Sequence, residues 1–176
     1  MRAVAFLRAV NVGGKNRVPM KDLRELVESL GLADVRTYVQ SGNVVFTGPS
    51  RGADALAGSL EQAVTDAFGV KAKVLVRTQA ELKKIATRHP FGKDESEPTR
   101  LHVLFLRDAP TKAKIGILEE DRFLPDRFSV KGREVFLHYP NGQGRSKLTI
   151  DYFERRLETV GTARNWKTVL TLLDML

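Results

Sequence analysis

The sequence predicts an α+β protein made of two halves with the same order of elements. Short β-branched and aromatic runs, typical of strands, alternate with stretches whose apolar residues recur at helical spacing. Tight turns join consecutive strands at 40–43 and again at 131–133. A polar, turn-rich segment at 91–99 separates the two series of elements, so we place the boundary between the halves there.

The first half opens with an apolar run at 3–10, which predicts a strand covered on both faces. A Gly-Gly-Lys turn follows the strand and leads to Pro19, which suits a first helical turn. Apolar residues then recur on one helical stripe from Met20 to Leu30, and Gly31 ends the predicted helix.

The next elements complete a βαββαβ order. Runs at 35–39 and 44–47 predict a hairpin, and a linker at 48–52 leads to a helix at 56–68 whose inward stripe includes Ala67. A fourth strand is predicted at 72–76. This order is the ferredoxin-like arrangement, an antiparallel sheet with its helices on one face.

A short helix is predicted at 79–87, because Thr78 and Glu81 form a capping box. We therefore divide the chain into a first half at 1–77, a connecting helix and linker at 78–98, and a second half at 99–176.

The second half repeats the order of the first in element type. The predicted elements are a strand at 101–106, a helix at 112–118, strands at 127–130 and 134–139, and a helix at 150–158. An extra C-terminal helix at 166–176, with Leu170 and Leu173 on its inward side, is expected to replace the final strand.

Composition limits the function classes. The 29 Lys and Arg residues outnumber the 21 Asp and Glu residues, which favours anionic partners. The absence of cysteine excludes disulfides, thiolate nucleophiles and cysteine-based zinc sites, and it fits the cytoplasm. No apolar run has the length of a membrane span, so we expect a soluble protein with no membrane partner.

Three stretches, L-R-A-V-N-V-G-G-K-N at 7–16, V-R-T-Y-V-Q-S-G-N-V-V-F at 35–46 and T-A-R-N-W-K-T-V-L-T-L-L at 162–173, resemble the bacterial family catalogued as domain of unknown function 1697. The resemblance implies a small bacterial protein with two ferredoxin-like halves, and it implies no activity. Ala9 departs from the family pattern, in which glycine is common at this position.

The predicted topology brings two features to one end of the first sheet. The first two strands run parallel, so the loop after the first and the hairpin after the second should be neighbours. Glycine amides, a lysine and a helix N-terminus together favour phosphate or carboxylate. The candidate ligand-binding residues are Arg8, Asn11, Gly13, Gly14, Lys15, Asn16, Gln40, Ser41 and Asn43 at this corner, and Arg164 further along the chain.

Structural interpretations of these residues remain open. The glycines also suit a tight turn, and the amides also suit bonds that hold loop to hairpin. Neither a P-loop nor a G-x-G-x-x-G motif is present, which argues against a nucleotide triphosphatase. Ser41 is exposed on a turn like a nucleophile, but no G-x-S-x-G elbow surrounds it, which favours a role in the hairpin turn. Arg164 directly precedes Asn165, a residue suited to cap the last helix, so this segment also has a structural interpretation.

Two further features have weaker signals. His102 and His138 would meet across the sheet if their strands pair, but no third ligand has a recognised spacing, so we expect no metal and no cofactor. The Gly-rich segment 139–147 carries two cations, which suits either phosphate contact or a mobile surface loop.

The leading hypothesis is a binding protein for a phosphate-bearing small molecule at the corner. Nucleic-acid binding is the alternative, although the signature of RNA-recognition modules is missing. An enzyme of unidentified reaction also remains open, and the sequence does not give the oligomeric state.

Overall fold

The computed structural model describes residues 1–49 and 52–176. The chain divides into two compact units, one formed by Met1–Ile85 with Leu172–Leu176 and the other by Ala86–Thr171. Each unit contains one antiparallel four-stranded sheet, which confirms the predicted fold class. The sequence-based division had instead placed 78–98 in a connecting segment. Part of the predicted linker at 48–52 lies outside the described residues.

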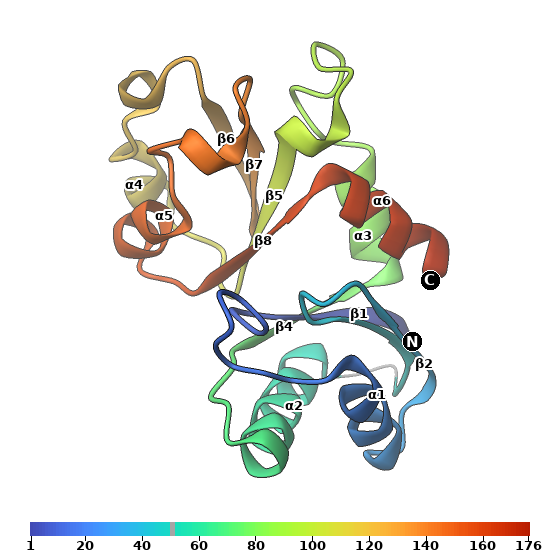
Figure 1. The fold of residues 1–176 in the computed structure, drawn as a ribbon. Helices are drawn as coiled ribbons and strands as arrows, with labels where there is room; N and C mark the ends of the chain where they lie inside the picture. Colours follow the sequence, from blue (N-terminus) through green and yellow to red (C-terminus); the bar gives the residue numbers. More distant parts are fainter. Residues whose placement is uncertain (50–51) are drawn as a thin grey trace. The chain divides into compact units, whose positions relative to one another are not determined.

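The first unit has strand order β2-β3-β1-β4 in its sheet. Its elements are β1 (Arg2–Leu7), α1 (Met20–Ser29), β2 (Ala33–Tyr38), β3 (Asn43–Thr47), α2 (Ala53–Phe68), β4 (Val74–Thr78) and α3 (Gln79–Ala86). Helices α1 and α2 cover one face of this sheet (Figure 1). Leu23 and Val27 of α1 and Leu60 and Val64 of α2 belong to the same core cluster as Ala5 of β1.

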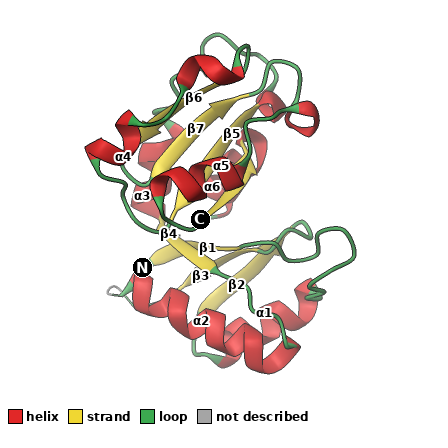
Figure 2. Cartoon of the chain, turned by 90° about the vertical axis from the view of Figure 1, so that its left-hand side faces the viewer, coloured by secondary structure: helices red, strands yellow, loops and turns green. Residues whose placement is uncertain are grey.

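The second unit has the equivalent strand order, β6-β7-β5-β8. Its helices and strands are β5 (Leu101–Leu106), α4 (Lys112–Gly116), β6 (Arg127–Lys131), β7 (Glu134–His138), α5 (Ile150–Leu157), β8 (Gly161–Asn165) and the first part of α6 (Trp166–Met175), whose residues from Leu172 onward belong to the first unit. Its core joins Phe153 and Leu157 of α5 to Leu104, Leu106 and Leu137 of the sheet. Figure 2 shows the two sheets and their helices from a second direction.

Strand β8 corrects the expectation that the last helix replaces a final strand. It pairs with β5 over five positions, from Gly161 opposite Leu106 to Asn165 opposite His102. The segment G-T-A-R-N has no apolar strand pattern, and its glycine fits a close approach, because a Cβ on Gly161 would lie 2.7 Å from Leu104 Cδ1. Both units therefore have the complete βαββαβ order, followed in each case by a helix.

Several predicted local features are confirmed. The Thr78 N–H donates to Glu81 Oε2 at 2.8 Å and the Glu81 N–H donates to Thr78 Oγ1 at 3.2 Å, which is the capping box of α3. The Thr168 N–H donates to Asn165 Oδ1 at 2.8 Å, so Asn165 caps α6.

Three details differ from the sequence predictions. Strand β1 ends at Leu7 instead of Val10, because residues 8–19 form a loop before α1. Ala67 of α2 is exposed, although we predicted it on the inward stripe of that helix. In α6, Leu170 is exposed and Leu172 is fully buried, so the inward stripe of this helix is rotated from the predicted one. None of the described helices is long and apolar enough to cross a membrane.

Candidate functional site

The corner predicted in the first unit does bring its two segments together. Asn11 Nδ2 donates hydrogen bonds of 2.9 Å to the carbonyls of Val18 and of Gln40, which lies in the β2–β3 hairpin. Asn11 Oδ1 accepts from the Val18 N–H, also at 2.9 Å. One asparagine therefore ties both ends of the loop to the hairpin.

The Gly-Gly-Lys segment is not the start of α1, contrary to the prediction. It is the tip of a small hairpin, in which the Lys15 N–H donates to the Val12 carbonyl at 3.0 Å and the Asn11 N–H donates to the Asn16 carbonyl at 3.0 Å. Gly13 and Gly14 have φ of 57° and 73°, the left-handed values of a tight hairpin turn. Because α1 begins at Met20, the helix dipole does not act at this turn.

Most amides of the corner are already hydrogen-bonded within the protein. Asn16 Nδ2 donates to the Ala9 carbonyl at 2.9 Å, and Asn43 Nδ2 donates to the Tyr38 carbonyl and to Ser41 Oγ. Ser41 thus has a place in the turn, as the sequence favoured. The Asn16 bond lies within the loop and the Asn43 bonds lie within the hairpin, so few side-chain donors are left for a ligand.

What the corner offers outward is charge on a protruding hairpin. Lys15 and Arg17 are exposed, and within the described part of the chain neither side chain makes a hydrogen bond or ion pair. Arg8 is half-buried beside the loop, and its N–H donates to the Lys73 carbonyl at 2.8 Å. The corner therefore presents exposed cations on a hairpin turn.

Arg164 belongs to the other unit and is buried in β8. Its Nη1 donates to Thr162 Oγ1 and to the Ala163 carbonyl, both at 2.8 Å. Burial lowers the pKa of Arg164 to about 10. Its contacts within β8 favour a structural role over the predicted ligand role.

His102 and His138 do not meet across the sheet. His102 lies opposite Leu137, and His138 lies opposite Leu101, so the two side chains sit on opposite faces. No group of three His, Cys, Asp or Glu residues suited to a metal occurs among the described residues.

His138 instead belongs to a cluster that the sequence did not reveal. Its Nε2 lies 3.0 Å from Glu95 Oε2, and its Nδ1 lies 3.3 Å from Arg127 Nη2. The hydrogen bond from His138 lowers the pKa of Glu95. Phe91 stacks on the His138 ring, with Arg127 above Phe91 at 4.7 Å. This cluster fastens the segment 91–95 to the sheet of the second unit.

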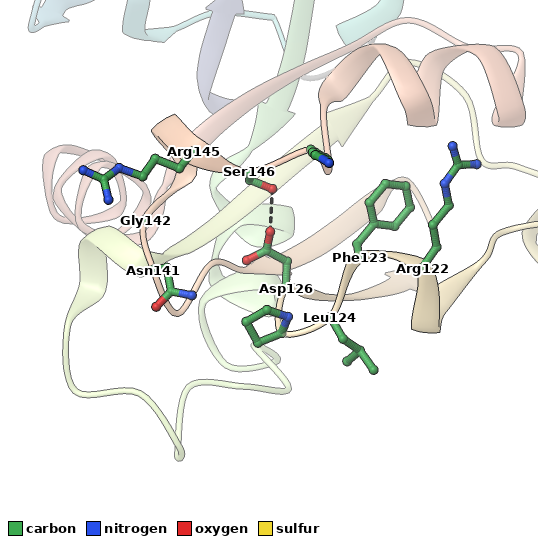
Figure 3. A pocket seen from close by; sticks show the side chains of 10 residues that line it. Arg122, Phe123, Leu124, Asp126, Asn141, Gly142, Arg145 and Ser146 are labelled. Carbon is green, nitrogen blue, oxygen red and sulfur yellow. Dashed lines mark hydrogen bonds between the residues drawn. The ribbon is translucent and has the colours of Figure 1, made fainter.

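A cavity of about 600 Å³ lies in the second unit. It lies between the segment before β6 and the loop from β7 to α5 (Figure 3). Its lining residues are Arg122, Phe123, Leu124, Pro125, Asp126, Asn141, Gly142, Arg145, Ser146 and Lys147.

The cavity combines cations with one carboxylate. Arg145 and Lys147 are exposed, and neither makes an ion pair within the residues that the structure describes. Arg122 is already paired with Glu119 Oε2, at 2.8 Å. Asp126 is 9% exposed, and its Oδ2 accepts a 2.6 Å hydrogen bond from Ser146 Oγ.

The loop that carries these cations is well bonded. Tyr139 Oη donates to the Leu148 carbonyl at 3.1 Å, and the Leu148 N–H donates to Ser146 Oγ at 2.9 Å. Burial, with Asp126 as a second cause, raises the pKa of Tyr139. The sequence had indicated this loop by its glycines and cations, but nothing in it connected the loop to 122–126, because that contact depends on tertiary structure.

The comparisons with known proteins support the fold. The sequence model of a family described as "Protein of unknown function (DUF1697)" matches residues 1–136. The solved structure of the conserved bacterial protein SP0830 from Streptococcus pneumoniae is similar, with a TM-score of 0.72 and 23% identity over 99% of this chain and 97% of that chain. Among curated proteins, none matches this chain.

Proposed function

We propose that this chain, which belongs to the DUF1697 family of proteins of unknown function, binds a small anionic ligand in the cavity of its second unit. The observation that carries the proposal is the pair of cations, Arg145 and Lys147, that line the cavity without ion-pair partners among the described residues. The absence of cysteine supports a cytoplasmic location for this function.

The size and charge of the cavity fit such a ligand. Ligand pockets typically enclose about 300–1,000 Å³, and the volume of about 600 Å³ falls inside this range. Three cations and one carboxylate line the cavity, so its side chains carry a positive excess even with Arg122 shared with Glu119. A phosphate group suits this excess, because arginine and lysine donate charge-assisted hydrogen bonds to its oxygens.

The corner in the first unit also offers cations, but fewer side-chain donors are left for a ligand. Its Asn11, Asn16 and Asn43 side chains bond to the protein itself, and Lys15 extends from a projecting hairpin. Small-molecule sites are concave, because a ligand gains affinity when most of its surface is buried. We therefore place the small-molecule site at the cavity.

Titration calorimetry with inorganic phosphate and with pyrophosphate tests the proposal. We expect binding to the wild type and about tenfold or greater weakening in Arg145→Ala and in Lys147→Ala, since each removes a charge-assisted bond. Lys15→Ala is the matched control, and its affinity should equal that of the wild type. Failure of both anions to bind would refute the proposal, and a loss confined to Lys15→Ala would move the site to the corner.

A second candidate function is binding of nucleic-acid phosphates by the projecting hairpin. The observation that favours it is the exposure of Lys15 and Arg17, which have no partners in the described part of the chain. An exposed cationic hairpin suits contacts with a continuous phosphate backbone.

Salt dependence distinguishes this second function. Binding to generic RNA or DNA should weaken steeply with salt, and the double variant Lys15→Ala, Arg17→Ala should reduce the slope by about two phosphate contacts. Arg145→Ala should leave the slope unchanged. No binding at low salt would exclude the second function and leave the first untouched.

A further inference from the structure

Asp126 is the least expected residue in a cavity for anions. Its carboxylate is nearly buried and lines the cavity, yet no ion pair joins it to Arg122, Arg145 or Lys147 among the described residues. A buried carboxylate is costly unless it is hydrogen-bonded or paired. Because Asp126 forms no ion pair with these cations, ion pairing does not explain why a carboxylate lies in this cavity.

Ser146 fixes the orientation of this carboxylate. The single hydroxyl proton of Ser146 is donated to Asp126 Oδ2 at 2.6 Å, while Ser146 Oγ accepts from the Leu148 N–H at 2.9 Å. Because both bonds constrain the hydroxyl, the carboxylate has one preferred position. Figure 3 shows Asp126 and Ser146 between Arg145 on one side and Phe123 on the other.

The second carboxylate oxygen, Oδ1, has no hydrogen-bond partner within the described residues. An ionised carboxylate only accepts hydrogen bonds, and Oδ1 is not sealed from solvent, so it is available to a donor from a ligand. Asp126 weakens the attraction of the cavity for a ligand that is anionic throughout. A ligand with a phosphate at one end and hydroxyl donors at the other meets the cations and the carboxylate together.

The remaining lining residues suit the body of such a ligand. Phe123, Leu124 and Pro125 give one side of the cavity an apolar surface, which can pack against the carbon–hydrogen face of a sugar ring. Asn141 adds an amide that donates and accepts hydrogen bonds, as hydroxyl recognition requires.

We infer that the cavity selects a phosphorylated sugar, with Arg145 and Lys147 binding the phosphate and the free oxygen of Asp126 accepting from a sugar hydroxyl. The inference rests on the proposed anion site and adds the class of ligand. The sugar phosphate is either free or part of a nucleotide, and the two sources share this chemistry.

Calorimetry with ribose 5-phosphate, adenosine monophosphate and inorganic phosphate tests the inference. We expect the wild type to bind ribose 5-phosphate at least tenfold more tightly than phosphate. A site for the free sugar phosphate binds ribose 5-phosphate as tightly as adenosine monophosphate or more so, whereas a nucleotide site prefers adenosine monophosphate. Either order supports the inference, provided that both exceed phosphate.

Asp126→Asn is the matched variant, because the amide keeps an oxygen that accepts from Ser146 and removes the charge. It should abolish the preference for ribose 5-phosphate and bind inorganic phosphate as well as the wild type or better. Ser146→Ala should weaken the preference by releasing the carboxylate. Circular dichroism should show unchanged folding, and if Asp126→Asn does not fold, the wild-type preference over phosphate decides the question.

Two failures are distinguishable. If phosphate binds but ribose 5-phosphate and adenosine monophosphate bind no more tightly, the sugar inference is wrong and the anion site stands. An undiminished preference in folded Asp126→Asn also overturns the inference. If no phosphate compound binds at all, the proposed function fails with it.

Discussion

The two units share a register but differ in where their loops are long. In the first, β1 pairs with β3 from Arg2 opposite Thr47, and in the second, β5 pairs with β7 from Leu101 opposite His138. Arg77 of β4 and Arg164 of β8 occupy equivalent positions, opposite Val4 and Val103, and both are buried. Strands β3, β1 and β4 therefore form a frame with the same register as β7, β5 and β8, whereas β2 pairs with β3 through an irregularity between Ala33 and Arg36 that the β6–β7 pair lacks.

The helices and loops on this frame differ. Helices α1 and α2 have 10 and 16 residues, whereas α4 and α5 have 5 and 8. The first unit has its long loop at 8–19, and the Asn11 side chain hydrogen-bonds this loop to Gln40 of the β2–β3 hairpin. The second has long segments before β6 and after β7, and these enclose a cavity. Loop placement thus differs between the units, and the cavity that we propose as the ligand site lies in the second.

The β2–β3 and β6–β7 hairpins give the largest predicted difference. Gly42 has φ of 71°, and a Cβ there would lie 2.5 Å from Val10 Cγ2. Gly132 has φ of 64°, but its nearest neighbour would be Glu134 Oε2 at 3.8 Å. Both alanine substitutions impose backbone strain, and only Gly42→Ala adds overpacking.

We expect Gly42→Ala to lower the free energy of unfolding by about 3 kcal/mol and Gly132→Ala by about 1 kcal/mol. Urea denaturation of both variants measures the difference. If both variants lost the same free energy of unfolding, the 8–19 loop would not pack tightly against Gly42. The two hairpins would then not differ in the way that we predict.

Acidification should affect the second unit selectively, because His89 and His102 lie there and the first unit has no histidine. Burial lowers the pKa of each of these histidines to about 4. In the unfolded chain these two histidines bind protons as the pH falls below about 6.5, whereas in the folded unit they stay neutral until about pH 4. The free energy of unfolding therefore falls as the pH drops from 6.5 toward 4. The shift of His102 alone should lower the free energy of unfolding by about 2 kcal/mol at pH 5, and the shift of His89 adds to this loss.

Amide hydrogen exchange at pH 7 and pH 5, corrected for intrinsic rates, measures this loss. Protection of β5 and β7 should decrease more than that of β1 and β3. His102→Gln is the control, since it removes one of the titrating groups and should reduce the pH dependence. Earlier loss of protection in β1 would contradict the prediction.

Asn11 and Asn141 compare the two long loops directly. Asn11→Ala removes three hydrogen bonds and should cost roughly 2 kcal/mol of stability. Asn141 is exposed, makes no hydrogen bond within the described residues and should tolerate alanine within about 0.5 kcal/mol. Thermal unfolding of the two variants measures the difference, and similar midpoints would mean that the first corner is not held by Asn11.

The sequence predicted most elements because their signals are local. The capping box of α3 and the apolar stripe of α2 depend on residues a few positions apart. Strand β8 was missed because G-T-A-R-N has no apolar strand pattern, and the close approach of Leu104 and Leu106 to Gly161 depends on tertiary structure. The repeated tripeptide F-L-R, at 6–8 and 105–107, was a signal of the duplicated frame, since these residues are equivalent in the two sheets.

The candidate site was less predictable. Topology correctly brought Asn11 to Gln40, but a list of residue types does not show that their amides bond to the protein itself. The cavity joins 122–126 to 141–147, and the pairing of Asp126 with Ser146 has no signature in sequence spacing. Such contacts depend on tertiary packing, which single-sequence patterns do not encode.

Ala9 gives the smallest predicted effect. It follows Arg8 and has φ of 56°, whereas the equivalent residue Asp108 follows Arg107 without a left-handed backbone. Glycine relieves the strain at Ala9, so Ala9→Gly should raise the free energy of unfolding by about 0.5–1 kcal/mol. Asp108→Gly should lower it by a similar amount, because it adds chain entropy and removes the bond from Thr159 Oγ1 to Asp108 Oδ2. Urea denaturation measures the free energy of unfolding of both variants. We expect changes of opposite sign at these equivalent positions, because the backbone after the arginine is left-handed in the first unit and not in the second. A loss of stability in Ala9→Gly would show that the left-handed turn carries no strain.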